Sequence, residues 1–408
     1  MPADFQSIQA ALDVAVDGDR VVVAPGRYYE ALRIPARRIH LIASAGPTLT
    51  TIDAQQLGTV VTFEGAPGRG TILEGFTLTN GLDPGMNKAG GVHIGEGASP
   101  VVRGNVIRQN LGYGIGHGIS LFRPASPLIE RNEIRHNRSG PGVTGGGGGG
   151  GIGIHDSVCS AAPACAVEIR NNYIGNNYVT AFSSGGGIFL NGARAIITGN
   201  VIEYNTVSNS GGGLSSSNGS PARIENNLFY ANLAIDYGGG IDSSVAYGDM
   251  GPIIINNTFV ANEAAVGSAI NTGGYDGQSR IANNVISAIG NGSALYCAPG
   301  HDSAAPLTRH NLVYAPSGSA YAGLCADMSG SNGNQSAEPA FMGETDFRLQ
   351  PDSPGVDEGE NSQSSQSTDL AGKARIADGN GDGLAVIDVG AYELPSPMIF
   401  ADGFEANP

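Results

Sequence analysis

One phrase recurs along most of this chain at intervals of 27 to 40 residues, as between positions 105 and 132 and between 132 and 172. Each copy joins a short apolar run to a fixed asparagine, as in SPVVRGNVIRQN (99–110) and RAIITGNVIEYN (194–205). The fixed asparagines are Asn105, Asn132, Asn172, Asn200, Asn227, Asn257 and Asn284. A unit of this length cannot bury its apolar face alone, so the copies must stack on one another. The repeat therefore predicts a solenoid.

Apolar and polar residues alternate within each copy, and no helical pattern separates the runs. This period of two predicts short strands, and strands joined by tight turns within each coil make a parallel β-helix with coils about 4.8 Å apart. We expect two inward stacks, Val102, Ile129, Ile169, Ile197, Ile224, Ile254 and Ile281 in one, and Ile107, Ile134, Ile174, Ile202, Phe229, Phe259 and Ile286 in the other. The fixed asparagines should lie in a turn, adopt the left-handed conformation and bond the neighbouring coil's backbone.

A second phrase, Gly-Gly-Gly-Ile, precedes the copies, for example in GGGIFLN (185–191) and GGGIDSS (238–244). The glycine run of GGGGGGGIGIHD (145–156) is an expanded copy of this phrase. It is not a nucleotide-binding loop, because no lysine follows it and nothing around it has the pattern of a βαβ unit.

The two ends of a solenoid need covering, because they expose strand edges and core. The segment 4–16 has apolar residues at helical spacing, Phe5, Ile8, Leu12 and Val16, and predicts a capping helix. We therefore expect an N-terminal capping helix in 1–18, a parallel β-helix in 19–330, an irregular segment in 331–394 that closes the other end, and a tail in 395–408.

The charge of the chain restricts its partners. The formal net charge is −16, and Lys88 and Lys373 are the only lysines, which argues against nucleic acid. A local arginine cluster can still bind an acidic polymer, so anionic substrates stay open. No apolar run approaches the roughly 20 residues of a membrane span. We expect a monomer.

The four cysteines predict two local disulfides, Cys159 with Cys165 and Cys297 with Cys325, in an oxidising compartment. Free buried thiols are the alternative. The start, Met1-Pro2-Ala3-Asp4, leads directly into sequence that looks folded, which suggests that an export signal was replaced by a methionine.

From the predicted helix to residue 315, the chain resembles the right-handed β-helix superfamily of pectate lyases, pectin esterases and polygalacturonases, first of all in SIQAALDVAVDGDRVVVAPGRYYEALRI (7–34). The pairs GGGI…FYAN and GSAI…FVAN also resemble the repeats of polymorphic outer-membrane proteins, which are adhesins. The segment 369–393 resembles a C-terminal region of secreted bacterial β-helix proteins, and IFADGFE (399–405) resembles a terminal tag of exported proteins. The resemblance implies a right-handed coil and a secreted or cell-surface bacterial protein, and it leaves the activity open.

Outward side chains at one repeat position should form files along the solenoid. Aligned on the Gly-Gly-Gly-Ile phrase, such files bring His93, Glu96, Arg123, His155 and Asp156 onto one face, with His117 just before its strand. The largest insertions fall nearby, and insertions often mark the binding face of a solenoid. We predict catalytic roles for all of these residues except His93, and substrate contacts for His93, Phe189, Asp242 and Tyr178. The alternative is a salt-bridged stack of Glu96, Arg123 and Asp156.

Two reactions on a polysaccharide fit such a face. In β-elimination a base, Arg123, His155 or His117, removes the proton beside a uronate carboxylate, and a cation or calcium held by Glu96 and Asp156 neutralises the charge. In hydrolysis two carboxylates flank the glycosidic oxygen, either Glu96 with Asp156 or Asp236 with Asp242. The paired aspartates and Arg-x-Lys of polygalacturonases are missing, as are the Lys-Arg pair of some lyases and the Asp-Pro-His-Glu signature of epimerases.

The segment DGNGDGLAVID (378–388) has the 1, 3, 5 spacing of a calcium loop in Asp378, Asn380 and Asp382, with Asp388 further on. The twelfth position is Val389, which departs from an EF-hand. We predict a stabilising calcium ion here, and an Asn/Gly turn is the alternative.

Two functions stay open from the sequence. The first is a secreted protein that binds and cleaves an extracellular polysaccharide as a lyase or hydrolase. The second is a non-catalytic surface adhesin or structural β-helix.

Overall fold

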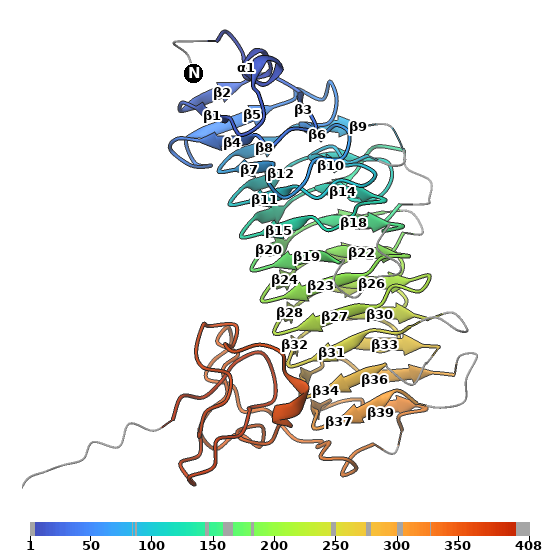
Figure 1. The fold of residues 1–408 in the computed structure, drawn as a ribbon. Helices are drawn as coiled ribbons and strands as arrows, with labels where there is room; N and C mark the ends of the chain where they lie inside the picture. Colours follow the sequence, from blue (N-terminus) through green and yellow to red (C-terminus); the bar gives the residue numbers. More distant parts are fainter. Residues whose placement is uncertain are drawn as a thin grey trace, which may run out of the picture.

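The computed structural model describes residues 5–83, 85, 88–142, 147–157, 166–180, 183–245, 250–274, 279–299, 305–326 and 328–396. Over these residues the chain winds into a parallel β-helix, with one short α-helix at its N-terminal end and an irregular segment near its C-terminal end (Figure 1). Three sheets of 11 strands and one of six run along the described part of the solenoid. The predicted all-β solenoid is confirmed.

Sheets A, B and C each take one strand from each coil, and sheet D takes one strand from six of the coils. Sheet A contains β1 (Arg20–Val23), β4 (His40–Ala43), β7 (Ile72–Glu74), β11 (Val101–Arg103), β15 (Leu128–Glu130), β19 (Val167–Arg170), β23 (Ala195–Thr198), β27 (Ala222–Glu225), β31 (Ile253–Ile255), β34 (Arg280–Ala282) and β37 (Leu307–Arg309). Sheet B contains β2 (Gly26–Tyr28), β5 (Thr50–Asp53), β8 (Thr77–Thr79), β12 (Val106–Arg108), β16 (Glu133–Arg135), β20 (Tyr173–Gly175), β24 (Val201–Glu203), β28 (Leu228–Tyr230), β32 (Thr258–Val260), β35 (Val285–Ser287) and β38 (Leu312–Tyr314).

The other two sheets follow sheet B within each coil. Sheet D contains β9 (Leu82–Asp83), β13 (Leu111–Gly112), β17 (Arg138–Ser139), β21 (Tyr178–Val179), β25 (Thr206–Val207) and β29 (Leu233–Ala234). Sheet C contains β3 (Leu32–Ile34), β6 (Val61–Phe63), β10 (Val92–Ile94), β14 (Ile119–Phe122), β18 (Ile152–His155), β22 (Ile188–Asn191), β26 (Leu214–Ser217), β30 (Ile241–Ser244), β33 (Ile270–Gly273), β36 (Ser293–Ala298) and β39 (Ser319–Gly323).

The two predicted apolar stacks form the core of sheets A and B. In sheet A, Ile129 pairs in register with Val102 on one side and Ile169 on the other, and all three side chains are buried. In sheet B, Ile202 pairs with Phe229, and the Phe229 and Phe259 rings stack with centroids 4.8 Å apart. Each such side chain contributes roughly 1.5–3 kcal/mol relative to an exposed one, so the vertical repetition of apolar residues stabilises the rod.

The fixed asparagines form a buried ladder at the turn between sheets A and B. Asn227 accepts hydrogen bonds from the Asn200 backbone N–H and side-chain amide, both at 2.9 Å, and donates to the Ile197 carbonyl at 2.9 Å. The predicted bond to the neighbouring coil is confirmed. The predicted left-handed conformation is wrong for the asparagine itself. It belongs to the preceding residue, for example Asn226 with φ 56°, which turns the chain so that the next side chain points inward.

A second asparagine ladder, which the sequence analysis missed, lies at the turn between sheets B and D. Its members are Asn110, Asn137, Asn177, Asn205, Asn232 and Asn262. They bond one another and the neighbouring coil in the same way, and all are buried. The ladders satisfy backbone groups at corners where the sheets cannot, which is why both asparagine positions recur.

Each glycine of the Gly-Gly-Gly-Ile phrase occupies a position that disfavours a larger residue, as Gly185, Gly186 and Gly187 show. Gly185 has φ 72°, a conformation that favours glycine. A Cβ on Gly186 would lie 2.4 Å from the Gly212 carbonyl oxygen and 3.1 Å from the Thr206 backbone of sheet D. A Cβ on Gly187 would lie 2.5 Å from another carbonyl oxygen, that of Gly213. The phrase lets the chain pass between sheet D and the core.

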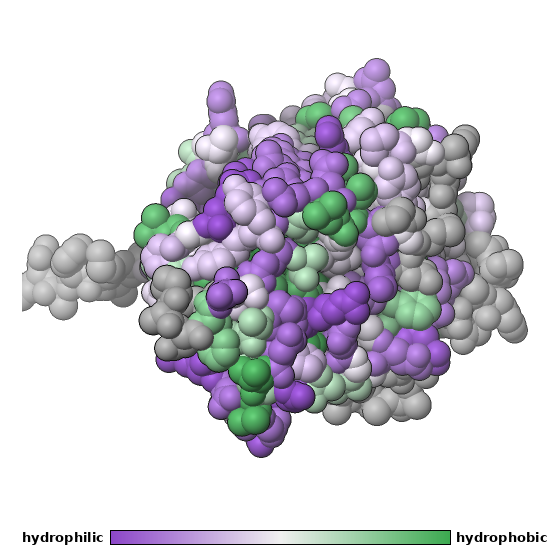
Figure 2. Space-filling model, turned by 90° about the horizontal axis from the view of Figure 1, so that it is seen from above, coloured by the Kyte–Doolittle hydropathy of each residue, from purple (hydrophilic) through white to green (hydrophobic). Residues whose placement is uncertain are grey.

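The N-terminal end is closed by helix α1 (Ile8–Val14). The Ser7 side chain caps it by accepting from the Ala10 N–H, and the Glu30 carboxylate accepts from the Ile8 and Gln9 N–H groups at 2.9 Å each. Ile8 and Leu12 are buried as expected, whereas Phe5 and Val16 lie outside the helix and are exposed. Seen from above, this end of the molecule is covered largely by hydrophilic residues, with small hydrophobic areas (Figure 2).

The irregular C-terminal segment lies beside the lower coils (Figure 1). Its residues bind sheets A and B from outside. Ser365 donates its backbone N–H to the buried Glu225 carboxylate at 2.7 Å, and the Ala391 N–H donates to Thr258 Oγ1 at 2.9 Å. This segment includes one turn of 3₁₀-helix, η1 (Asn361–Gln363), and a buried ion pair of Arg375 with Glu393 at 3.0 Å. Much of the segment therefore packs along the flank of the solenoid.

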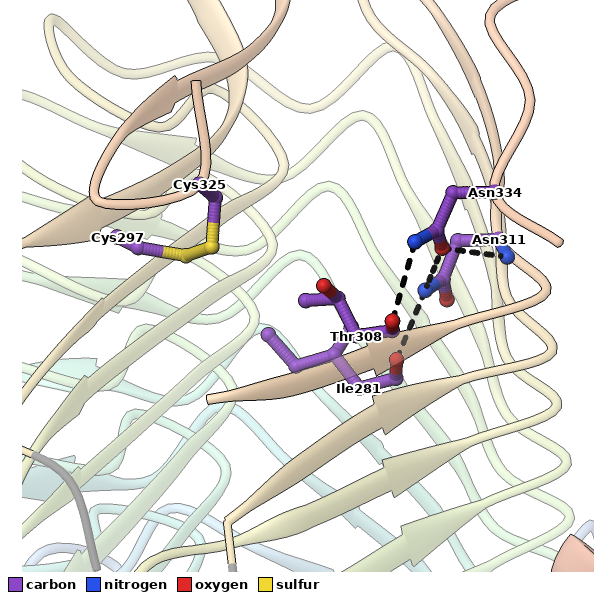
Figure 3. Close-up of a disulfide and its surroundings, with 6 residues drawn as sticks. All are labelled: Ile281, Cys297, Thr308, Asn311, Cys325 and Asn334. Atoms are coloured by element: carbon purple, nitrogen blue, oxygen red, sulfur yellow. Dashed lines mark hydrogen bonds between the residues drawn. A yellow bond between two sulfur atoms is a disulfide. The ribbon is translucent and has the colours of Figure 1, made fainter. Parts of the chain in front are cut away.

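The disulfide predicted between Cys297 and Cys325 is confirmed (Figure 3). It joins β36 to the turn after β39, and both cysteines are buried. Leu324 and Met328, next to it, pack against the core after the last strand of sheet C. The asparagine ladder ends nearby, where Asn311 donates to the Asn334 side-chain oxygen. Cys159 and Cys165 lie outside the described residues, as does most of the predicted tail.

Within the described residues, no helix combines the length and the hydrophobicity that a membrane crossing requires.

Candidate functional site

The outward files predicted for sheet C are confirmed by its strand register. His93 pairs with Ser120, Ser120 with Gly153, Gly153 with Phe189, and Asp242 with Asn271. Two residues further along the strands, Phe122 pairs with His155 and His155 with Asn191. Residues far apart in the chain are therefore neighbours on this sheet.

A second layer covers the first of these files. Single-residue bridges join Ile115 to Gly148 and Gly148 to Ser184 in the loops that precede sheet C. A Cβ on Gly148 would lie 2.7 Å from the Phe189 ring, and a Cβ on Gly153 would lie 2.5 Å from the Ile115 side chain. The loops thus lie directly on the outward face of the sheet near its first residues.

Three of the residues that we predicted to contact substrate are buried or half-buried on this sheet. His93 is 8% exposed, and its Nδ1 lies 2.9 Å from Ser120 Oγ. Burial, and to a smaller extent the Lys88 charge, lower the pKa of His93 to about 4, and the Asp83 charge opposes both. Phe189 and Asp242 are half-buried. Burial raises the pKa of Asp242 to about 6, against the hydrogen bond of 2.6 Å that it accepts from Asn271.

His117, a predicted base, is buried and is not part of the outward face. It occupies the position of the middle glycine in the Gly-Gly-Gly-Ile phrase, and its ring packs on Gly112 of β13. Burial lowers the pKa of His117 to about 4, against a hydrogen bond with the Gly114 backbone. The phrase Gly-His-Gly places the residue before its strand, but only packing against sheet D decides that it points inward.

The remaining predicted catalytic residues do come together at the end of the sheet C strands. We call Glu96, Phe122, Arg123, His155 and Asp156 the edge cluster. Arg123 forms an ion pair with Glu96 at 3.0 Å, and both side chains are about half exposed. The Arg123 backbone N–H donates to the His155 carbonyl at 2.8 Å, so the two residues lie on adjoining coils.

His155 is held between an aromatic ring and a carboxylate. Its ring stacks on Phe122 with centroids 5.6 Å apart and an interplanar angle of 21°. Its Nδ1 lies 3.1 Å from a carboxylate oxygen of Asp156, although the two groups are not aligned for a hydrogen bond. A small rotation of either side chain would let Nδ1–H donate to Asp156 and leave the lone pair on Nε2.

The ion pairs also test the salt-bridged alternative. Glu96 and Arg123 are paired as that alternative expects, but the ion-pair partner of Asp156 within the described residues is His155. Phe122 was not predicted as a site residue, although it stands in the same file as His155 and Asn191. Alignment of the coils was the signal that could have found it.

The comparison with known families agrees with this architecture. Residues 67–194 and 116–333 match the family described as the right-handed β-helix region, and together they span more than half of the chain. The chain belongs to the right-handed β-helix family. The expected handedness and superfamily are thereby confirmed, whereas family membership by itself assigns no activity. No curated protein is significantly similar to this β-helix sequence.

Tyr178 lies on another face of this β-helix. It belongs to β21 of sheet D, is 51% exposed, and lines a surface groove with Arg138 and Asn176. The edge cluster and Tyr178 are therefore separate sites.

The predicted calcium residues of this β-helix do not form one site as they are placed. Asp378 uses its carboxylate to accept the N–H groups of its own loop, for example that of Gly381 at 2.7 Å, and Asn380 accepts from the Asp382 N–H at 2.8 Å. Asp388 is buried and accepts from the Asp357 and Leu394 N–H groups instead. Among the described residues, no three His, Cys, Asp or Glu side chains are placed to hold a metal. Calcium binding stays a prediction.

Proposed function

We propose that this is a secreted β-helix protein that binds an extracellular polysaccharide at the edge cluster and cleaves it there. The observation that carries the proposal is that His155 lies between Phe122 and Asp156, with Arg123 on the adjoining coil. Phe122 supplies an aromatic ring that can pack against a sugar, and His155 is a base that the Asp156 carboxylate can orient. Arg123 supplies a cation.

β-Elimination assigns a role to each of these groups. Asp156 orients His155 so that Nε2 can remove the proton beside a uronate carboxylate. Arg123 stabilises the charge that develops on that carboxylate, for which it must exchange part of its contact with Glu96. Hydrolysis is the other reaction of the proposal, with Glu96 and Asp156 of the edge cluster as the carboxylate pair. Asp236 and Asp242, which lie outside the edge cluster, are the alternative pair. The raised pKa of Asp242 suits a general acid.

Three further features support the location and partners in the proposal. The disulfide between Cys297 and Cys325 suits an oxidising, extracellular compartment. The net charge of −16 disfavours nucleic acid as the partner. Helix α1 covers the N-terminal end of the solenoid, where exposed strand edges would otherwise favour association, and this supports a monomer.

The reaction can be tested on a panel of uronate and neutral polysaccharides with and without calcium. An unsaturated, absorbing product identifies elimination, and new reducing ends without absorbance identify hydrolysis. We expect Arg123→Ala and His155→Ala each to lower the rate about 100-fold or more, because each removes one group of the proposed machinery.

The matched control is Arg170→Ala. Arg170 forms an ion pair with Glu130 on sheet A at 3.0 Å, the distance between Arg123 and Glu96, although Glu130 is buried and Glu96 is exposed. Arg170 lies on another sheet from the edge cluster. This variant should keep full activity. Thermal unfolding of all three variants checks that the fold is retained. Full activity in both Arg123→Ala and His155→Ala would remove the edge cluster as the site of cleavage.

A non-catalytic surface protein is the second candidate. The observation that favours it is the ion pair of Arg123 with Glu96, because a paired arginine at a half-exposed corner also suits a purely structural role. Binding to polysaccharide without any product over the whole panel would favour this candidate.

A further inference from the structure

A groove of about 650 Å³ follows the corner between sheets B and D. One bank consists of Gln109, His136 and Asn176, and the other of Leu111, Arg138 and Tyr178. We call these six residues the corner groove. It lies apart from the edge cluster, which is at the end of the sheet C strands.

The first bank is built by the corner itself. Gln109, His136 and Asn176 have φ values of 57°, 55° and 56° and precede the buried ladder asparagines Asn110, Asn137 and Asn177. Each left-handed residue turns the chain so that the ladder asparagine points inward while the side chain before it stays exposed. Hydrogen-bonding side chains are thus repeated at the spacing of the coils, about 4.8 Å.

The second bank comes from the strands of sheet D. Leu111 pairs in register with Arg138, and Arg138 pairs with Tyr178, so the three side chains form a file parallel to the first bank. Arg138 is exposed and has no ion-pair partner within the described residues. Tyr178, the register partner of Arg138, is 51% exposed.

Arginine residues lie in and beside the groove, although the net charge of the protein is −16. Arg108 and Arg135 are register partners on sheet B, directly before the first bank. Arg135 is paired with Glu133, whereas Arg108 has no ion pair among the described residues. Burial lowers the pKa of His136, and the charges of Arg135 and Arg108 lower it further against Glu133. An anionic ligand in the groove would meet the Arg138 guanidinium, and Arg108, which is also without an ion pair among the described residues, lies on the adjoining strand of sheet B.

We propose that the corner groove binds a strand of anionic polysaccharide that runs along the solenoid axis. Arg138 contacts a carboxylate or sulfate, Tyr178 packs against a sugar ring, and Gln109 and Asn176 bond hydroxyl groups. A sugar ring is about as long as the rise from one coil to the next, so successive sugars meet successive coils. The groove holds the polymer without cleaving it, and the inference does not depend on cleavage at the edge cluster.

Binding is measured by affinity electrophoresis of the full chain in gels that contain polygalacturonate, a sulfated glycan, methyl-esterified polygalacturonate or polyglutamate. Retardation by polygalacturonate or by the sulfated glycan supports the proposal and tells which anionic group is recognised. Equal retardation by the esterified, neutral polymer overturns the anionic requirement. Equal retardation by polyglutamate overturns recognition of a sugar.

The variants are made on a His155→Ala background, so that cleavage cannot consume the ligand. Arg138→Ala and Tyr178→Ala should each weaken binding about tenfold, while Tyr178→Phe keeps the ring and should keep the affinity. Arg280→Ala is the matched control, because it removes from sheet A another exposed arginine that has no ion-pair partner among the described residues. Unchanged binding in Arg138→Ala and Tyr178→Ala overturns the site. Product formation, assayed separately without this background, reports on the edge cluster alone.

Discussion

At the scale of single residues, the histidines show how one repeat places the same side chain in different environments. His93 and His117 are buried and have pKa values lowered to about 4, while His155 is half-buried at the edge cluster. The uncharged ring is the form that burial favours, because a charged imidazolium inside the solenoid lacks solvent. The buried histidines therefore suit packing, and His155 suits chemistry.

The pH dependence of stability should reveal His117. Its folded-state pKa of about 4 lies below the ordinary value of 6.5, so its contribution to stability is present above pH 6.5 and is lost as the pH falls toward 4. The loss is about 3 kcal/mol over this window. We expect denaturant unfolding to show a flatter decline between pH 6.5 and 4 for His117→Gln than for the unchanged protein.

The exposed His136 provides the comparison, and His136→Gln should alter the decline much less. Parallel stability curves for His117→Gln and the unchanged protein would mean that the buried ring is already protonated in the folded state. The burial of His117 could not be predicted from the phrase Gly-His-Gly, because it depends on the small residue Gly112 that faces it in sheet D.

At the scale of strands and turns, much of the fold could be predicted because its cause is repetition. The stacks through Ile129 and Ile202 follow from alternation that recurs in each coil. The covering of sheet C could not be predicted in the same way, since it depends on single-residue bridges such as that of Ile115 with Gly148, which leave no alternating pattern. For that reason Glu96, Arg123, His155 and Asp156 were predicted correctly as neighbours, whereas Phe122 was missed and His93 and His117 proved to be buried.

The asparagine ladder predicts a large effect for Asn227→Ala. The substitution removes the acceptor for the buried Asn200 N–H and the bonds to the Ile197 carbonyl and the Asn257 side chain. With about 1 kcal/mol for each lost bond and more for the unsatisfied N–H, we expect a loss of about 3–5 kcal/mol. Urea unfolding measures it.

Asn291 is exposed and outside both ladders, so Asn291→Ala should change the free energy of unfolding by less than about 0.5 kcal/mol. A loss at Asn227 no larger than the loss at Asn291 would show that water replaces the ladder bonds at little cost.

At the scale of the whole molecule, a solenoid is stabilised by contacts between neighbouring coils, so a change at one end should act mainly near that end. Helix α1 closes the first coils, and the disulfide of Cys297 with Cys325 joins β36 to the turn after β39 across 28 residues of sequence. Between them, the ladders and stacks continue from coil to coil. The disulfide therefore lies at the end of the solenoid, where the last coil contacts a neighbouring coil on one side only.

Replacing both cysteines in Cys297→Ala/Cys325→Ala should therefore loosen the last coils first. A cross-link over a loop of this length stabilises by about 3–4 kcal/mol, but a local opening can proceed without unfolding the rest. We expect hydrogen exchange under native conditions to accelerate in β36 and β39 and to stay unchanged in β7 and β11. Equal acceleration along the whole rod would show that the solenoid unfolds as one cooperative unit, and no acceleration would show that packing of Leu324 and Met328 is enough to hold the end.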